Sequence, residues 1–234
     1  MNVRLLALLI ITMIGLSACG KNNDAPPVYP MSEINFTNAS ADTVNLYLNG
    51  TRLNSTSNLP PGFSSSYYSV NSGDQVFQVK KPFNTATSTI HNLFSFPLTM
   101  QANQAYSLFI VDETAANAFS TPDTLRTDTA ASTCLVRFVN ASPDAGSLDM
   151  TVGTASFKNI AFKLATPFSL VSITAAASAT GRIPVQIFTA GSTTPLAKDS
   201  VTLSQGRSYT VYSKGKIAGT GNAALGIGAT INSN

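Results

Sequence analysis

Residues 136–144 read VRFVNASPD and residues 34–42 read INFTNASAD, so one motif occurs twice in the chain. Five positions are identical in the two copies, and the identical residues, such as Phe36 and Phe138, lie 102 positions apart. Each copy starts with alternating apolar residues, as in a half-buried β-strand, and ends in Asn, Ser and Asp, which favour turns. The repeat predicts two domains of the same fold, each of about a hundred residues.

The sequence around both copies is typical of β-structure. Residues 44–48 alternate between apolar and polar side chains, and the following pair Asn49-Gly50 favours a tight hairpin. Residues 148–152 alternate in the same way, and no stretch has a convincing helical period. We therefore expect an all-β protein with two tandem antiparallel β-sandwich domains of the immunoglobulin-like or transthyretin-like kind.

The repeat and the composition of the segments between its copies predict the domain boundaries. The expected segments are a signal peptide at 1–18, a tether at 19–32, sandwich domains at 33–126 and 134–234, and a linker at 127–133. A hairpin over residues 80–97 is longer than its counterpart in the second copy. The apolar residues expected in the two cores are Phe36, Leu46, Leu48, Val76 and Leu108, and Phe138, Leu148, Met150, Ile187 and Val211.

The first nineteen residues predict export and lipid anchoring. Arg4 precedes an apolar run over residues 5–16, which is too short to span a bilayer and fits a signal peptide. The run ends in Leu16-Ser17-Ala18-Cys19, which resembles the lipobox of bacterial lipoproteins. That resemblance implies acylation of Cys19, membrane lipid as a partner, and, with Gly20 next, location at the outer membrane. Whether the protein faces the periplasm or the cell surface stays open.

Charge and cysteine content exclude several classes of site. The formal net charge of +3 comes from scattered residues, so no basic stripe is available for a nucleic acid. With Cys19 acylated, Cys134 has no partner for a disulfide within the chain, and its apolar neighbours predict a buried thiol that packs as a small hydrophobe. One histidine and one free thiol do not make a zinc site.

The motif, the strand over 148–152, and the segments 191–195 and 208–211 together resemble the DUF4397 family, domains of unknown function in bacterial envelope proteins that are often lipid-anchored. The second copy matches well, whereas the first departs in Ala41, where the family prefers proline, and in the longer 80–97 hairpin. The resemblance implies the fold and brings no catalytic residue, cofactor or ligand with it.

Metal binding and hydrolysis are the chemical alternatives. Oxygen atoms of the Asn-Ala-Ser-x-Asp segments are Ca²⁺ ligands in type, but each loop has one carboxylate, apart from Asp149 near the second, so we favour a plain turn. His91 is the chain's one histidine and therefore the only candidate base for a Ser-His-Asp triad. It lies in the 80–97 hairpin and follows no nucleophile motif, so we expect no enzyme, metal or cofactor.

Aromatic side chains of the first domain are the remaining lead to a ligand. They either fill the core or line a sugar- or peptide-binding face, and the six considered are Phe63, Tyr67, Tyr68, Phe83, Phe94 and Phe96. We expect a non-enzymatic envelope lipoprotein that acts in binding, adhesion or scaffolding, with an envelope protein or a glycan as partner. The alternative is a glycan-binding accessory lipoprotein of a polysaccharide-uptake system. Oligomeric state cannot be derived from these patterns.

Overall fold

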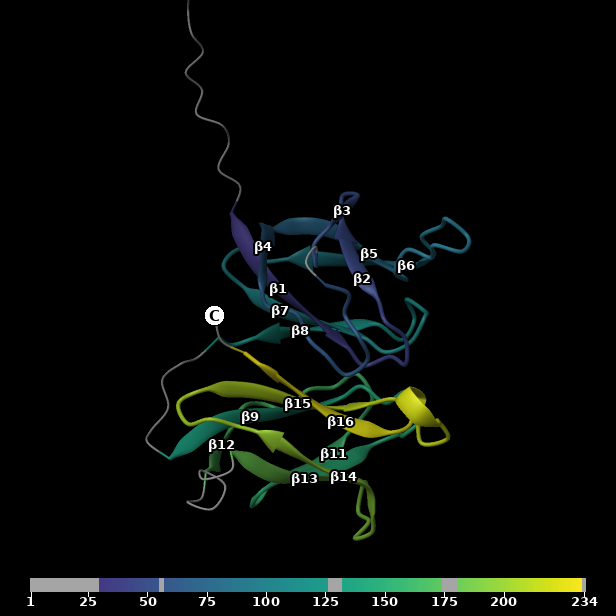
Figure 1. The fold of residues 1–234 in the computed structure, drawn as a ribbon. Helices are drawn as coiled ribbons and strands as arrows, with labels where there is room; N and C mark the ends of the chain where they lie inside the picture. Colours follow the sequence, from purple (N-terminus) through teal and green to yellow (C-terminus); the bar gives the residue numbers. More distant parts are fainter. Residues whose placement is uncertain (1–29, 55–56, 126–131, 174–180, 233–234) are drawn as a thin grey trace, which may run out of the picture.

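The structure is a computed structural model that describes residues 30–54, 57–125, 132–173 and 181–232 (Figure 1). These residues form two β-sandwiches, domain 1 with strands β1 to β8 and domain 2 with strands β9 to β16. The expected all-β fold class is confirmed. The predicted signal peptide and Cys19 lie outside the described residues.

Domain 1 consists of two four-stranded sheets that enclose one core. One sheet has the order β4-β1-β7-β8, with the strands Tyr68–Asn71, Met31–Asn38, Ala105–Ile110 and Phe119–Asp123. The other has the order β3-β2-β5-β6, with the strands Thr51–Arg52, Asn45–Leu48, Gly73–Lys80 and Asn92–Met100. β1 and β7 run parallel, and the other strand pairs are antiparallel.

Domain 2 repeats this topology strand for strand. Its sheets have the orders β12-β9-β15-β16 and β11-β10-β13-β14. The strands of the first are Ser169–Ser172, Thr133–Asn140, Ser208–Lys214 and Gly226–Ile231; those of the second are Ala155–Ile160, Leu148–Val152, Arg182–Thr189 and Pro195–Thr202. β9 and β15 are the counterparts of β1 and β7 and also run parallel. Both motif copies therefore occupy the same place in the topology, in β1 and in β9 and the turns that follow.

Two strands begin earlier than the sequence predicts. β1 starts at Met31, and Met31 and Ser32 pair with Asn71 and Val70 of β4, so both residues belong to the sheet and not to the expected tether. β9 starts at Thr133, the last residue of the expected linker. Backbone hydrogen bonds to the neighbouring strands explain both earlier starts, because they hold these residues in the sheet without requiring an apolar side chain.

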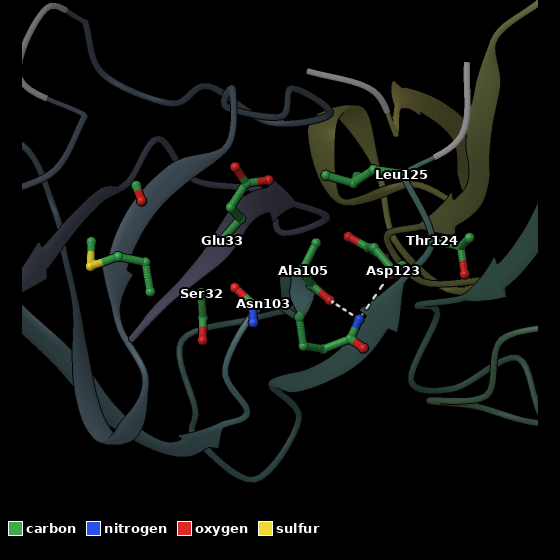
Figure 2. Close-up of a pocket in the computed structure, with 10 residues that line it drawn as sticks. Ser32, Glu33, Asn103, Ala105, Asp123, Thr124 and Leu125 are labelled. Atoms are coloured by element: carbon green, nitrogen blue, oxygen red, sulfur yellow. Dashed lines mark hydrogen bonds between the residues drawn. The ribbon is translucent and has the colours of Figure 1, made fainter. Parts of the chain in front are cut away.

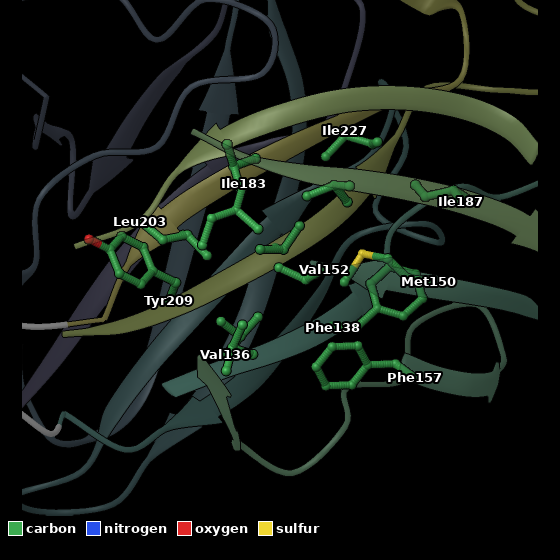
Figure 3. Close-up of a cluster of buried hydrophobic side chains, with 14 of the residues drawn as sticks. Val136, Phe138, Met150, Val152, Phe157, Ile183, Ile187, Leu203, Tyr209 and Ile227 are labelled. Atoms are coloured by element: carbon green, nitrogen blue, oxygen red, sulfur yellow. The ribbon is translucent and has the colours of Figure 1, made fainter. Parts of the chain in front are cut away.

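The two cores contain the expected residues with one exception. Of those named for domain 2, all are fully buried, and Figure 3 shows Phe138, Met150 and Ile187 in that core. In domain 1, Leu48 is half-buried and packs on the core, whereas Val76 is 51% exposed. The prediction for Val76 was wrong because alternation in β5 turns Phe77 and Val79 inward instead.

Helical structure in the described residues is limited to a 3₁₀ turn at Gly221–Ala223. No helix in that part of the chain is long and apolar enough to cross a membrane. Between β5 and β6 the chain extends into a hairpin arm, residues 81–91, which projects from domain 1 (Figure 1). Lys81 at its base contacts both Glu113 and Asp42, at 2.5 and 3.5 Å, which ties the arm to two other loops of the domain.

Candidate functional site

The two domains pack through counterpart sheets, β4-β1-β7-β8 and β12-β9-β15-β16, and we call this interface the seam. Every residue of β7 is buried although alternate side chains point away from the core of domain 1. The outward-facing Phe109 stacks on Phe119 at 5.0 Å and meets Tyr212 of domain 2 edge-on at 5.8 Å. Since these side chains form one buried cluster with Val139 and Ala141, the seam unites the domains into one body.

Beside this apolar cluster the seam contains an ion pair, Arg137 of β9 with Asp123 of β8. The Arg137 side chain also donates to the Pro122 carbonyl at 2.8 Å and to the Thr210 hydroxyl at 2.8 Å. Asp123 Oδ2 accepts hydrogen bonds from the hydroxyls of Tyr67 and Ser107, each at 2.7 Å. A buried charge is tolerated only when paired and hydrogen-bonded, and both charges here meet that condition.

The seam contacts repeat about a pseudo-twofold axis. Asn35 and Arg137 are counterparts, because they pair in register with Ser107 and Thr210 of the counterpart strands β7 and β15. Arg137 donates to Thr121 of domain 1 at 3.2 Å, and Asn35 approaches Thr230 of domain 2, the counterpart of Thr121, at 3.4 Å. The duplicated domains thus pair as two subunits of a symmetric dimer do, through the same surface on each.

A tight turn of domain 1 holds an exposed aromatic ring at one side of the seam. In the turn from Pro60 to Phe63, Pro61 precedes Gly62, which has φ +79°, and the Phe63 amide donates to the Pro60 carbonyl at 3.3 Å. The Tyr212 hydroxyl of domain 2 donates to the Gly62 carbonyl at 2.9 Å. The Phe63 side chain is 62% exposed. An exposed ring on a backbone fixed by both domains is preorganised for a ligand.

Phe63 stands in a groove that follows the seam and the last residues of β16. Its central hollow is about 800 Å³ and is lined by Glu33, 62–67, Ser69, Arg207 and 229–231. A second hollow, about 550 Å³, shares Arg207 and 229–231 with it and adds Val201, Thr202, Ser204 and Tyr209. A third, also about 550 Å³, shares Glu33 and Ser69 and reaches Asn103 and 123–125. We call these three adjoining hollows, which share lining residues, the seam groove.

The walls of the seam groove are fixed by hydrogen bonds. Gln104 donates to the carbonyls of Ala105 and Asp123 at 2.8 and 2.9 Å, and dashed lines mark these bonds in Figure 2. The Tyr67 hydroxyl bridges Asp123 and Asn232. Burial, with Asp123 beside it, raises the pKa of Tyr67 far above its usual value, so the phenol stays protonated and keeps donating at physiological pH.

The six aromatic candidates fall into three groups. Phe63 and Tyr67 line the seam groove. Phe94 is buried, and Tyr68 and Phe96 pack against the core of domain 1, where Tyr68 lies 5.8 Å from Phe36. Phe83 is 56% exposed on the hairpin arm. The six side chains therefore do not form one face: three belong to the core or its edge, and Phe63 and Tyr67 remain as candidates for one site.

The asparagine of each motif copy stabilises the turn that follows it by hydrogen bonds to backbone carbonyls. Asn38 Nδ2 donates to the carbonyls of Asp42 and Leu59 at 2.7 and 2.9 Å, and Asn140 Nδ2 bonds those of Gly146 and Ile160 at 2.8 and 2.9 Å. Asp144, the motif's last residue, accepts hydrogen bonds from the backbone amides of Ile217 and Ala218 at 2.9 and 3.3 Å. The described residues hold no cluster of three or more His, Cys, Asp or Glu side chains that could bind a metal.

His91 and Cys134 lie apart from the seam groove. His91 is exposed on the hairpin arm, beside Lys81, Phe83, Asn84 and other residues that line a hollow without a carboxylate. Within the described residues its imidazole has no hydrogen-bond or ion-pair partner, so a Ser-His-Asp arrangement is not formed there. Cys134 is fully buried, as expected, and burial raises the pKa of its thiol to about 11.

Sequence reasoning missed the residues that build the seam. Arg137 and Asp123 belong to no sequence pattern that predicts a buried ion pair, and Tyr212 is one of several aromatic residues in strand-like sequence. The sequences of β7 and β15, AYSLFI and SYTVYSK, do contain a signal of the seam. Neither strand alternates apolar residues with charged ones, as a strand with one solvent-facing side would. Strands buried on both faces lose the alternation of apolar and polar residues, so this composition points to a covered sheet.

Comparison with known proteins places the chain in a family. The family model described as Domain of unknown function (DUF4397) matches residues 32–151 and, again, residues 134–227. A search of curated proteins finds no match. Among solved structures, the crystal structure of CBMbc (family CBM26) from Eubacterium rectale Amy13K in complex with maltoheptaose matches with 10% identity and a TM-score of 0.27, over 87% of this chain and 97% of that chain.

Proposed function

The chain belongs to the DUF4397 family, and we propose that it is a non-enzymatic lipoprotein of the bacterial cell envelope that binds its ligand in the seam groove. Its role in this proposal is adhesion or scaffolding at the outer membrane. The observation that carries it is Phe63, a 62% exposed ring on a turn that the Tyr212 hydroxyl clamps from the other domain. Exposed rings on rigid loops bind with little loss of conformational entropy.

The anchoring part of the proposal rests on the first nineteen residues. Acyl chains on Cys19 would contribute about 0.8 kcal/mol per buried methylene, so two or three chains hold a protein on a membrane almost permanently. Cys19→Ala should move the protein from the membrane fraction to the soluble fraction and abolish incorporation of a labelled fatty acid. Membrane retention and labelling that survive this substitution would refute acylation at Cys19.

A second candidate function, glycan binding for polysaccharide uptake, is favoured by the polar lining of the seam groove. The exposed side chains along it include the hydroxyls of Ser66, Ser69, Thr202 and Ser204. Hydroxyls both donate and accept hydrogen bonds, as sugar hydroxyls do, and Phe63 offers a ring face for stacking.

The groove is tested by retention of outer-membrane extract on the immobilised mature chain. We expect Phe63→Ala to reduce retention about tenfold or more, as removal of a central aromatic anchor does, and Phe83→Ala to leave it unchanged. Phe83 is a matched control because it is also exposed, at 56%, but lies on the hairpin arm. Treating the extract with protease or with periodate separates the two candidates: loss of retention after periodate alone supports the glycan. Equal retention by both variants would refute the groove as the site.

A further inference from the structure

The two arginines at the seam differ in whether their charge is paired with a carboxylate of the protein. Arg137 is buried and paired with Asp123. Arg207, at the turn into β15, is exposed, and within the described residues its guanidinium has no hydrogen-bond or ion-pair partner. Elsewhere, Lys81 and Lys158 contact carboxylates of the chain at 2.5 and 3.0 Å. Arg207 therefore offers the seam groove a positive charge that the fold itself does not use.

Arg207 also has a central place in the groove. It lines both the hollow of about 800 Å³ and the adjoining one of about 550 Å³, so a ligand that extends from one to the other passes it. Its backbone is fixed, because its carbonyl accepts the Leu135 amide at 2.9 Å and the neighbouring Gly206 amide donates to Thr133 at 2.9 Å. From this fixed backbone the guanidinium can reach into the groove, and a guanidinium binds a carboxylate through two parallel hydrogen bonds.

The rest of the lining favours a sugar chain over an extended peptide. Peptide grooves supply apolar pockets for alternate side chains, whereas exposed apolar groups here are limited to Phe63 and Ile231 in the central hollow, at 62% and 43% exposure. The hydroxyls of Ser66 and Ser69 line the same hollow as Phe63 and Arg207, and those of Thr202 and Ser204 line the adjoining hollow that shares Arg207. This arrangement combines a stacking ring, hydroxyl partners and one cation, Arg207, while the half-buried Glu33 of β1 also lines the hollow and already has a partner of its own.

From this arrangement we propose that the ligand of the seam groove is a linear acidic oligosaccharide, with a sugar ring on Phe63 and a uronate carboxylate on Arg207. The proposal rests on the proposed function of the groove and adds the ligand's chemical class. It implies that charge decides selectivity, because a neutral sugar of the same shape would keep the stacking and the hydroxyl contacts and lose only the ion pair.

The test uses the mature chain with Cys19→Ser, so that it is purified without acyl chains, and isothermal titration with three probes. The probes are a galacturonate hexamer, the same hexamer with its carboxyl groups reduced to alcohols, and a glutamate hexamer. We expect the acidic sugar to bind about tenfold tighter than its reduced form, the tenfold preference to vanish in Arg207→Gln, and added salt to weaken only the acidic sugar. Arg182→Gln, an exposed arginine of domain 2 outside the groove, should behave as the parent chain.

Each of the other outcomes refutes one part of the proposal. Equal binding of the acidic and reduced sugars, or an Arg207→Gln variant that keeps the preference, refutes the acidic class and leaves the groove as a glycan site. Tighter binding of the glutamate hexamer refutes the sugar. Failure of both sugars to bind refutes the oligosaccharide, while the proposed function still stands if retention of envelope material depends on Phe63.

Discussion

Arg137 of domain 2 and Asp123 of domain 1 form an ion pair inside the seam, with side chains that are 4% and 0% exposed. The pair is surrounded by the hydroxyls of Tyr67, Ser107 and Thr210, which satisfy the remaining hydrogen-bonding groups. Such a pair adds little to stability when compared with apolar side chains, but it penalises any arrangement that separates its members. It therefore selects this one pairing of the domains.

Asp123→Ala should destabilise the protein strongly. The substitution leaves the guanidinium of Arg137 buried without its counter-ion, which costs roughly 3–5 kcal/mol. Chemical denaturation followed by circular dichroism measures the loss, and separate unfolding of the two domains would appear as a second transition. Arg182→Gln is the control, because Arg182 lies 4.0 Å from Asp199 with both side chains more than half exposed, and it should cost less than about 1 kcal/mol. Equal effects of the two substitutions would contradict a structural role for the seam ion pair.

Gly228→Ala should also destabilise the seam, whereas Gly226→Ala on the same strand should not. A Cβ atom at Gly228 would lie 2.3 Å from Cζ of Tyr212, and at Gly226 its nearest neighbour is the flexible Lys214 side chain at 3.4 Å. Overpacking of this kind costs about 1–3 kcal/mol, against about 0.5 kcal/mol or less for an accommodated methyl group. Thermal unfolding of both variants checks the difference. A tolerated Gly228→Ala would mean that the Tyr212 ring does not lie against β16.

Asn140→Ala should cost about 3 kcal/mol because four hydrogen bonds of the side chain are lost within a buried turn. The amide nitrogen bonds Gly146 and Ile160, and the oxygen accepts from Ser142 and Ser213. Asn71→Ala, at an exposed position of β4, should change the free energy of unfolding by about 0.5 kcal/mol or less. If addition of Ca²⁺ raised the melting temperature and Asn140→Ala removed that rise, the turn would be a metal site and not a turn held only by its own hydrogen bonds.

Stability should fall in alkaline solution as buried phenols ionise. Burial raises the pKa of Tyr212 from 10.0 to about 12, so the folded protein holds this proton more tightly than the unfolded chain. The stabilisation is complete below pH 10 and is lost as pH rises from 10 toward about 12. Denaturation midpoints across this range measure the decline, which should be shallower in Tyr212→Phe. Identical profiles for the parent chain and Tyr212→Phe would contradict the burial of this hydroxyl.

The fold was predictable because the two copies of the motif fix corresponding strands, and alternation marks inward residues such as Leu46 and Met150. Val76 shows the limit: in QVFQVK, either Val76 or Phe77 satisfies a period of two, and only the cross-strand register decides between them.

The seam groove was not predictable from local patterns. It forms where 62–67 of domain 1 meets 229–231 of domain 2, segments that contact only after the domains pair. Arg207 and Phe63 lie far apart in the sequence and belong to no motif. The sequence pointed to the groove only through the aromatic side chains of Phe63 and Tyr67. Aromatic type alone did not distinguish them from the aromatic residues that fill the core.

The chain has no tryptophan, so Phe63→Trp places the sole indole of the protein in the seam groove. We predict that outer-membrane extract, or the galacturonate hexamer, shifts and enhances the emission of this indole in a saturable way, and that Phe83→Trp on the hairpin arm does not respond. A ligand that binds both variants with equal affinity and changes the emission of neither, or only that of Phe83→Trp, would contradict the seam groove as the binding site.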